Sequence, residues 1–134
     1  MYETVIVKTR KREELIDVSE TIRTVVKKSD IKNGVCILSV PHASAAITIN
    51  EGSDKNVLDD ILEALRKIAP KGTWKHDKID DNADAHIKSS FIGTSTIVPI
   101  RDNMLLLGRW QTILFCEFDG PRERTIMVNL LADK

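Results

Sequence analysis

The strongest constraint on the fold is a series of strand patterns in the last third of the sequence, separated only by short turns. These patterns cover residues 94–100, 105–108, 109–118 and 122–131. Two of the turns contain Arg-Asp-Asn and Asp-Gly-Pro, residue types that favour tight reversals. Strands and helices elsewhere also come in clusters and not as regular parallel units. We therefore expect a single α+β domain over residues 1–134, with a mainly antiparallel sheet packed against helices.

Four shorter strand patterns occur earlier in the chain. They cover residues 3–9, 13–18, 35–40 and 45–50. Between the second and the third, a short helix is expected to begin at Ser19, a favoured N-cap residue, and to end near Gly34. The first four strand patterns are thus divided by a helix into two pairs, which is consistent with an α+β arrangement.

The clearest helix in the sequence lies between Val57 and Ile68. Its apolar residues recur at steps of three and four, as on the buried face of an amphipathic helix. Ser53 or Asp54 is expected to cap its start, and Pro70 is expected to end it. One face of this helix is therefore predicted to pack against the sheet.

The segment after this helix predicts irregular structure followed by a second, shorter helix. Residues 71–81 have no hydrophobic period and many turn-forming residues, so we expect a loop there. The short helix is expected from Asn82 to Phe91, with Gly93 ending it. No internal repeat, linker or low-complexity segment divides the chain.

The charge balance excludes several classes of partner. Twenty basic and twenty acidic residues give a formal net charge of zero, so no overall field attracts nucleic acid or an anionic membrane surface. Aromatic residues make up 4% of the chain, too few for a base-stacking surface. No apolar run is long enough to span a bilayer, and the first residues lack the apolar segment of a signal peptide. We therefore expect a cytoplasmic protein that binds neither nucleic acid nor membrane.

The sequence gives little support for a cysteine or serine nucleophile. Cys36 and Cys116 each lie inside an apolar run, which favours a reduced, buried thiol. Ser44 would act as a nucleophile only with a base to activate it, and no Gly-x-Ser-x-Gly elbow is present.

Three histidines with small or polar neighbours are the candidate metal ligands. His42 follows a strand, His76 lies in the irregular loop, and His86 falls inside the short helix. Three imidazoles would leave one coordination position of a metal open for water or substrate. Four nearby aspartates are candidates to orient them: Asp77, Asp80, Asp81 and Asp84. The spacing matches no short metal motif, so unrelated surface or capping histidines are the alternative.

Alternation along residues 109–118 places polar side chains among apolar ones on one face of the expected strand. That face carries Arg109, Gln111 and Glu117, whereas the opposite face, which includes Trp110, is expected to be core. The polar face indicates a binding site. A solvated surface or an interface between subunits would explain the same pattern.

A basic cluster suggests that the ligand is phosphorylated. Arg122 and Arg124 point to the same face after a turn, and paired guanidiniums suit bidentate phosphate capture. Lys88 is a further candidate cation. Ser89 lies on the helix face that carries His86 and could hydrogen-bond an anion. The alternative is that these arginines, which flank turns, form exposed ion pairs and bind no phosphate.

Four motifs, taken in order, make the chain similar to one known family. They are His42-Ala-Ser-Ala-Ala leading to Asn50-Glu51, Asn82-Ala-Asp-Ala-His-Ile-Lys-Ser-Ser, Gly108-Arg-Trp-Gln, and Glu117-Phe-Asp-Gly-Pro-Arg. The chain resembles the YjbQ-like proteins, commonly labelled secondary thiamine-phosphate synthases. It departs from the family pattern at Arg109, where Thr is usual, and at Ala43, where Thr is also usual.

The resemblance implies a compact α+β fold that assembles as a homotrimer, with a metal bound by His42, His76 and His86 near a subunit boundary. The implied activity joins a pyrimidine diphosphate to a thiazole phosphate and releases pyrophosphate. Lys88, Arg122 and Arg124 would hold the leaving group, with Ser89 and Gln111 as further substrate contacts.

The chemistry of the ligands leaves two alternatives to this reaction open. Diphosphate chemistry usually employs magnesium, which prefers oxygen ligands, whereas three imidazoles select zinc or another transition metal. A metal-dependent hydrolase of a small phosphorylated or cyclic metabolite, with Glu51 or Glu117 as general base, is therefore the second hypothesis. The third is a non-catalytic trimer that binds a metal or a metabolite.

Overall fold

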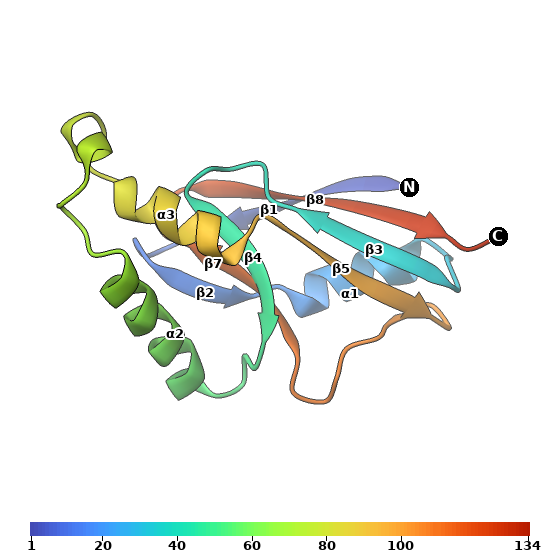
Figure 1. Cartoon of the computed structure of the whole chain (residues 1–134). Helices are drawn as coiled ribbons and strands as arrows, with labels where there is room; N and C mark the ends of the chain where they lie inside the picture. The colour runs from blue at the N-terminus through green and yellow to red at the C-terminus, as the bar shows by residue number, and fades with distance from the viewer.

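The computed structural model describes residues 1–134 and contains two antiparallel sheets (Figure 1). The larger sheet has five strands, in the spatial order β1 (Tyr2–Lys8), β8 (Glu123–Ala132), β3 (Gly34–Ser39), β5 (Ser95–Arg101) and β6 (Met104–Leu105). The smaller sheet has three, in the order β2 (Glu14–Asp17), β7 (Thr112–Glu117) and β4 (Ala45–Asn50). All paired strands are antiparallel. The predicted α+β domain with a mainly antiparallel sheet is confirmed.

Three α-helices and one 3₁₀ helix complete the fold. They are α1 (Ser19–Lys28), α2 (Lys55–Ile68), the 3₁₀ helix η1 (Lys75–Lys78) and α3 (Ala83–Ile92). Figure 1 shows α2 and α3 on the same side of the molecule, beside the three-stranded sheet. None of the helices combines the length and the apolar composition needed to cross a lipid bilayer.

Two apolar clusters hold these layers together. The main core has 17 buried residues, from both sheets and from one face of α1. A second core of six buried residues lies beneath α2 and α3 and includes Leu62 and Ala85. Strand β7 serves both cores, because Phe115 points into the main one and Cys116 into the second. Both faces of β7 are therefore covered, as its unbroken burial from Ile113 onward shows.

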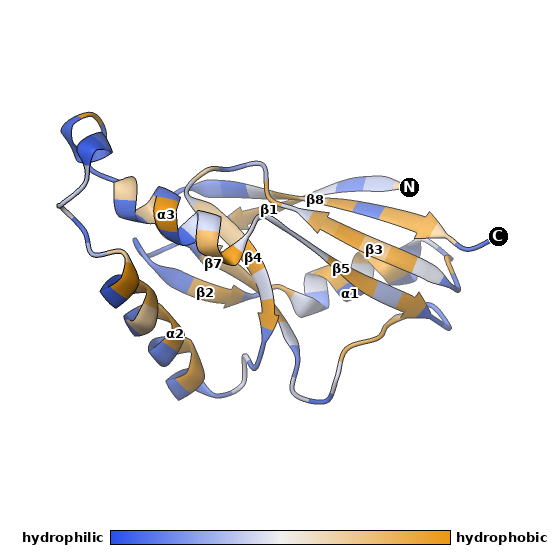
Figure 2. Ribbon diagram, in the orientation of Figure 1, coloured by the Kyte–Doolittle hydropathy of each residue, from blue (hydrophilic) through white to orange (hydrophobic).

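The helix predicted around Val57 is found with the expected cap. Asp54 precedes α2, and its carboxylate accepts a hydrogen bond of 2.8 Å from the N–H of Asn56. Figure 2 shows apolar and polar residues alternating around α2, and the apolar residues Leu62 and Leu65 are buried. The short helix ending at Gly93 and the strand at residues 45–50 are confirmed as well.

The expected strands at residues 105–108 and 109–118 are shorter in the structure than predicted. Strand β6 ends at Leu105 and β7 begins at Thr112, with a loop between them. A turn closes this loop, because the N–H of Gln111 donates to the carbonyl of Gly108 and the Gln111 side chain accepts from the N–H of Gly108. The prediction that Trp110 is core was wrong, since 61% of it is exposed.

Two other boundaries also differ from the sequence prediction. Helix α1 ends at Lys28, before the expected stop near Gly34, because Asp30 adopts a left-handed conformation with φ of 59°. Gly34 instead begins β3. The segment 71–81, expected as a loop, contains the one-turn helix η1.

One face of the five-stranded sheet is uncovered and rich in apolar side chains. Ile6, Ile97 and Leu131 are each more than half exposed, whereas their neighbours Val98 and Leu130 are buried. The alternation shows that the inner face of this sheet supplies the main core. The outer face is left open in a single chain.

Candidate functional site

A buried ion pair lies at the end of β7. Glu117 is fully buried, and its carboxylate accepts hydrogen bonds from the guanidinium of Arg124, the hydroxyl of Thr9 and the N–H of Asp119. Arg124 in turn donates to the hydroxyl and the carbonyl of Ser44. Burial alone would raise the pKa of Glu117, but the hydrogen bonds outweigh it and hold that pKa below its usual range.

This ion pair and its hydrogen bonds involve three of the predicted site residues, Glu117, Arg124 and Ser44. Glu117 is ionised and shielded from solvent, and Arg124 is only 2% exposed. Ser44 is buried, and its hydroxyl accepts from Arg124 instead of facing a base. All three form an internal network that joins β7, β8 and the start of β4. Their predicted roles as base, phosphate ligand and nucleophile stay predictions.

His42 lies beside this network, with part of its ring exposed. Its Nε2 accepts a hydrogen bond of 2.9 Å from the N–H of Thr125. Burial lowers the pKa of His42, and the positive charge of Arg124 lowers it further. The neutral imidazole therefore carries its proton on Nδ1, which leaves neither nitrogen free for a metal in this conformation.

His76 and His86 form a second, separate pair. Their rings meet edge to face, with centroids 4.9 Å apart. The Nε2 atom of His76 is buried and has no hydrogen-bond partner, and Asp80 Oδ2 lies 3.6 Å from it. Imidazole nitrogen is a ligand type that transition metals prefer, and here one such nitrogen is buried without a partner beside a second imidazole.

Asp77 is the residue that brings this pair together. Its carboxylate accepts 3.0 Å hydrogen bonds from the N–H groups of Trp74 and Ala83. These backbone hydrogen bonds, led by the one from Trp74, lower the pKa of Asp77. They tie η1, which carries His76, to the first turn of α3, which carries His86. The sequence suggested Asp77 as an orienting group, and the structure shows that it orients the backbone.

No group of three His, Cys, Asp or Glu side chains within the chain is placed to hold a metal ion. The structure brings His76 and His86 together and leaves His42 apart from them, hydrogen-bonded to β8. A single chain therefore supplies at most two of the three predicted imidazole ligands at one point.

Arg122 is the predicted cation that hydrogen bonds link indirectly to the start of α3. It is about half exposed and donates to the carbonyl and the carboxylate of Asp119. The same carboxylate accepts from the amide of Asn82, the residue before α3. Asn82 also provides the carbonyl that accepts from the N–H of His86. The turn after β7 and the start of α3 thus form one continuous polar surface.

Lys88 is not exposed on this surface. Its ammonium is buried between the carboxylates of Asp84 and Glu13, at 2.9 and 2.7 Å. Asp84 also pairs with Arg12, and the hydrogen bonds from Arg12 and Lys88 lower its pKa against the opposing effect of burial. Sequence reasoning missed Glu13 and Arg12, because nothing in the β1–β2 turn marks them as partners of a helix 70 residues away.

Ser89 is buried one residue further along α3. Its hydroxyl donates a 2.6 Å hydrogen bond to the carbonyl of Ala45. This contact fixes α3 against the start of β4. Lys88 and Ser89 therefore anchor the helix that carries His86, and their predicted contacts with phosphate stay predictions.

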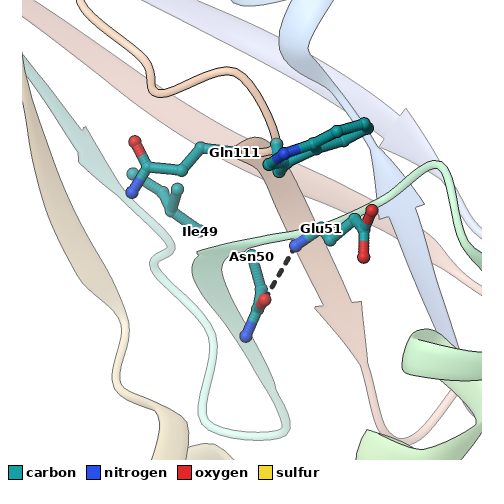
Figure 3. A pocket seen from close by; sticks show the side chains of 5 residues that line it. Ile49, Asn50, Glu51 and Gln111 are labelled. Atoms are coloured by element: carbon teal, nitrogen blue, oxygen red, sulfur yellow. Dashed lines mark hydrogen bonds between the residues drawn. The ribbon is translucent and has the colours of Figure 1, made fainter.

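Glu51 and Gln111 lie in a pocket of about 480 Å³ at the other end of β4 (Figure 3). Ile49, Asn50 and Trp110 complete its lining. Ala45 is paired with Glu117, whereas Asn50 is paired with Thr112. Five residues of extended strand, roughly 17 Å, thus separate the pocket from the Glu117 end within one chain.

The comparisons with known proteins agree over almost the whole chain. The family model described as UPF0047 protein YjbQ-like matches residues 3–133. The chain belongs to the YjbQ-like UPF0047 family. A UPF0047 protein of Methanocaldococcus jannaschii is 45% identical over 96% of this chain and 92% of its own. The UPF0047 protein YugU of Bacillus subtilis is 38% identical over 98% of this chain and 99% of its own.

Solved structures of YjbQ-like relatives have the same fold. A YbjQ-like protein of unknown function from Sulfolobus solfataricus has a TM-score of 0.95 and 39% identity, covering 99% of this chain and 97% of its own. A hypothetical protein from Aeropyrum pernix also has a TM-score of 0.95, with 37% identity and 99% coverage of both chains. The fold is thus shared, whereas neither relative's description states an activity.

Proposed function

We propose that this YjbQ-like protein is a metal-dependent enzyme that acts on a small phosphorylated metabolite. The observation that carries the proposal is the His76–His86 pair, with its unpartnered Nε2, on the polar surface that also holds Arg122. Imidazole nitrogens favour zinc or another transition metal over magnesium. When bound, such a metal would supply Lewis-acid activation of water or of a phosphoryl oxygen.

The chain's own residues would divide the remaining work. The guanidinium of Arg122 has one terminal nitrogen, Nη1, without a partner, and it would bind a phosphate oxygen. Asp80 is exposed and is the carboxylate beside His76, so it would accept a proton from an attacking water. Asn82 and Asp119 would hold the two halves of the surface in place.

Hydrolysis is the reaction that this arrangement supports best. Expelling pyrophosphate needs several cations around the leaving oxygens. Lys88 and Arg124 are buried and neutralised by carboxylates, which leaves Arg122. Attack by water on a single phosphorylated or cyclic substrate needs fewer cations around the reacting phosphate than pyrophosphate release does.

Thiamine-phosphate synthesis is the second candidate. It rests on the resemblance of the four motifs and on Arg122, whose half-exposed guanidinium would bind the phosphate of a thiazole or pyrimidine precursor. In this reaction the ring nitrogen of the thiazole forms the new C–N bond to the pyrimidine methylene, and the bond from that carbon to the pyrophosphate oxygen breaks.

We further propose that the third metal ligand comes from a neighbouring subunit of a homotrimer. A single chain lacks it, and the apolar outer face of the five-stranded sheet supports association because Ile6, Ile97 and Leu131 lie open on it. A non-catalytic trimer would have the same interface but no turnover.

Metal analysis of untagged protein tests the site. We expect close to one transition metal ion per chain, lost in His86→Ala because this imidazole is a direct ligand, in a particle three times the mass of one chain. Lys78→Ala, an exposed change in the same 3₁₀ turn, is the matched control and should keep its metal. Unchanged metal content in His86→Ala would refute the proposal.

Two assays on the metal-loaded protein separate the reactions. Hydrolysis predicts phosphate release from phosphorylated metabolites with water alone, abolished in His86→Ala. Synthesis predicts pyrophosphate release only when both thiamine precursors are present, with the same loss in His86→Ala. If neither product appears but a metabolite raises the melting temperature, the protein is a binding module and the enzyme proposal fails.

A further inference from the structure

Strand β1 is a free edge of the five-stranded sheet, with β8 as its only partner (Figure 1). The residues that flank β1 are both bonded to β8: the N–H of Thr9 donates to the carbonyl of Arg122, and the carbonyl of Met1 accepts from the N–H of Leu130. Bonded and non-bonded residues alternate along an antiparallel ladder, so the odd-numbered residues of β1 bond to β8. The N–H and C=O groups of its even-numbered residues therefore point away from the sheet.

The sequence of β1 gives this edge little protection. Natural proteins shield an edge strand with proline, with a bulge, with lysine or by keeping the strand short. The opposite edge strand, β6, is two residues long. In contrast, β1 has seven residues, no proline or glycine and an unbroken register with β8, and its one lysine, Lys8, is its last residue. An edge of this kind pairs with another extended strand unless something covers it.

The side chains of β1 alternate between the core and the open face of the sheet. Val7 is buried in the main core, and Val5 is half-buried and packs against the same core. Tyr2, Thr4 and Ile6 lie on the outer face, where 61% of Tyr2 and 51% of Ile6 are exposed. A strand added at this edge would cover Val5 on one side of the sheet and Ile6 on the other. It would therefore bury apolar surface as well as satisfy backbone groups.

The backbone groups of β1 are complementary to those of a second β1 that runs antiparallel to it. When Val5 lies opposite its own copy, every residue of β1 has a residue opposite it. Tyr2 then faces Lys8 of the second copy, and Thr4 faces Ile6. These are the even-numbered residues, whose N–H and C=O groups are open, so each of them would gain both of its missing hydrogen bonds.

The side chains also suit this pairing. Glu3 would face Val7 and Lys8 would face Tyr2, so no like charges meet. The ammonium of Lys8 could lie over the ring of Tyr2. The remaining pairs, Val5 with itself and Thr4 with Ile6, join β-branched residues, which pack well across strands. Self-complementarity of backbone, charge and shape favours a second copy of this chain over an unrelated peptide.

We propose that β1 pairs with β1 of a second copy across a two-fold axis at Val5, so that two five-stranded sheets become one continuous sheet. Two strands of this length bury less than the roughly 1,000 Å² of a stable interface. The pairing is therefore reversible, and dilute protein keeps the mass of the unpaired particle. The contact uses neither the metal nor the histidine pair, so failure of the metal test leaves it standing.

Light scattering between about 10 µM and 1 mM protein measures this pairing. We expect the particle mass of the wild type to double over that range. Thr4→Pro removes an N–H group that points away from β8, so it should abolish the doubling and leave the β1–β8 ladder intact. Thr4→Ala keeps that N–H group and is the matched control, which should double in mass as the wild type does.

Two charge variants test the register. Thr4→Lys combined with Ile6→Lys sets like charges opposite each other across the axis and should prevent the doubling. Thr4→Lys combined with Ile6→Glu sets opposite charges there and should pair at least tenfold more tightly than the first variant. Both variants lose the same apolar side chain, so the effect of that loss cancels in the comparison.

Amide hydrogen exchange shows whether the edge itself is covered. The N–H groups of Thr4 and Ile6 should exchange at least tenfold more slowly in concentrated than in dilute protein, whereas that of Val5, which is bonded to β8 in both, should change less. The proposal is overturned if the wild-type mass does not rise, if Thr4→Pro doubles as the wild type does, if the two charge variants pair equally, or if exchange at Thr4 and Ile6 does not slow.

Discussion

The ion pair between Glu117 and Arg124 shows how a buried charge is held in this protein. Each partner is at most 2% exposed, so neither can rely on water for solvation. The carboxylate has acceptor sites for four donors and receives hydrogen bonds from Arg124, Thr9 and Asp119. A network in which every hydrogen-bonding group has a partner is stable, whereas loss of one ion leaves the other as an unpaired buried charge.

We expect Glu117→Gln to lower the free energy of unfolding by about 3 kcal/mol, because Arg124 would stay buried without its counter-ion. Urea unfolding of the purified variant measures this change. The double variant Glu117→Gln, Arg124→Met removes both charges and should recover part of the loss. Arg122→Met breaks a half-exposed pair and should cost less than about 1 kcal/mol. Equal costs for Glu117→Gln and Arg122→Met would contradict this account.

Sequence patterns predicted most elements because local signals and tertiary structure agree in them. Helix α2 has a capping aspartate, an apolar stripe and a proline shortly after its end. Strand β4 begins and ends at the residues predicted from the sequence. Disagreement arose at residues 106–111, because Arg109, Trp110 and Gln111 alternate in polarity but the side chain of Gln111 closes a turn. Alternation alone does not distinguish a strand from such a loop.

Long-range contacts explain why the candidate site was only partly predictable. The polar residues on which the prediction rested do cluster, but in four places: the Glu117 network, the histidine pair, the Lys88–Asp84 ion pair and the Glu51 pocket. Lys88 was expected to bind phosphate because no sequence signal reveals that Glu13 reaches it from the β1–β2 turn. The separation of Glu51 from Glu117 follows from strand register, which a single sequence does not specify.

At the scale of the whole molecule, several elements are joined by carboxylates whose pKa values are lowered in the fold. Asp77 joins η1 to α3, Asp84 and Glu13 join α3 to the β1–β2 turn, and Glu117 joins β7 to β8. Hydrogen bonds and cations hold the pKa of each below its ordinary value. The unfolded chain therefore binds more protons than the folded chain in mild acid.

The sign of this difference predicts acid unfolding. The stabilisation is fully present above the unfolded pKa values of about 4, and it is lost as the pH falls through the lower values of the folded state. We expect the urea midpoint to fall slightly as the pH drops below about 6.5, because the lowered pKa of His42 lets the unfolded chain bind that proton first, and to fall steeply below about pH 4. Asp84→Asn should show a lower midpoint at pH 7 and a shallower fall. A midpoint that stays constant down to pH 3 would contradict the prediction.

The pairing of β1 with β8 has a consequence for how the protein is made. β1 has β8 as its only neighbour in the sheet, and β8 begins at Glu123, far along the chain from the end of β1 at Lys8. At typical translation rates of roughly ten residues per second, β1 would wait on the order of ten seconds for its partner to leave the ribosome. During that interval its backbone N–H and C=O groups are open to any other extended segment. During this interval β1 is therefore an open strand edge to which a chaperone or a neighbouring nascent chain could add.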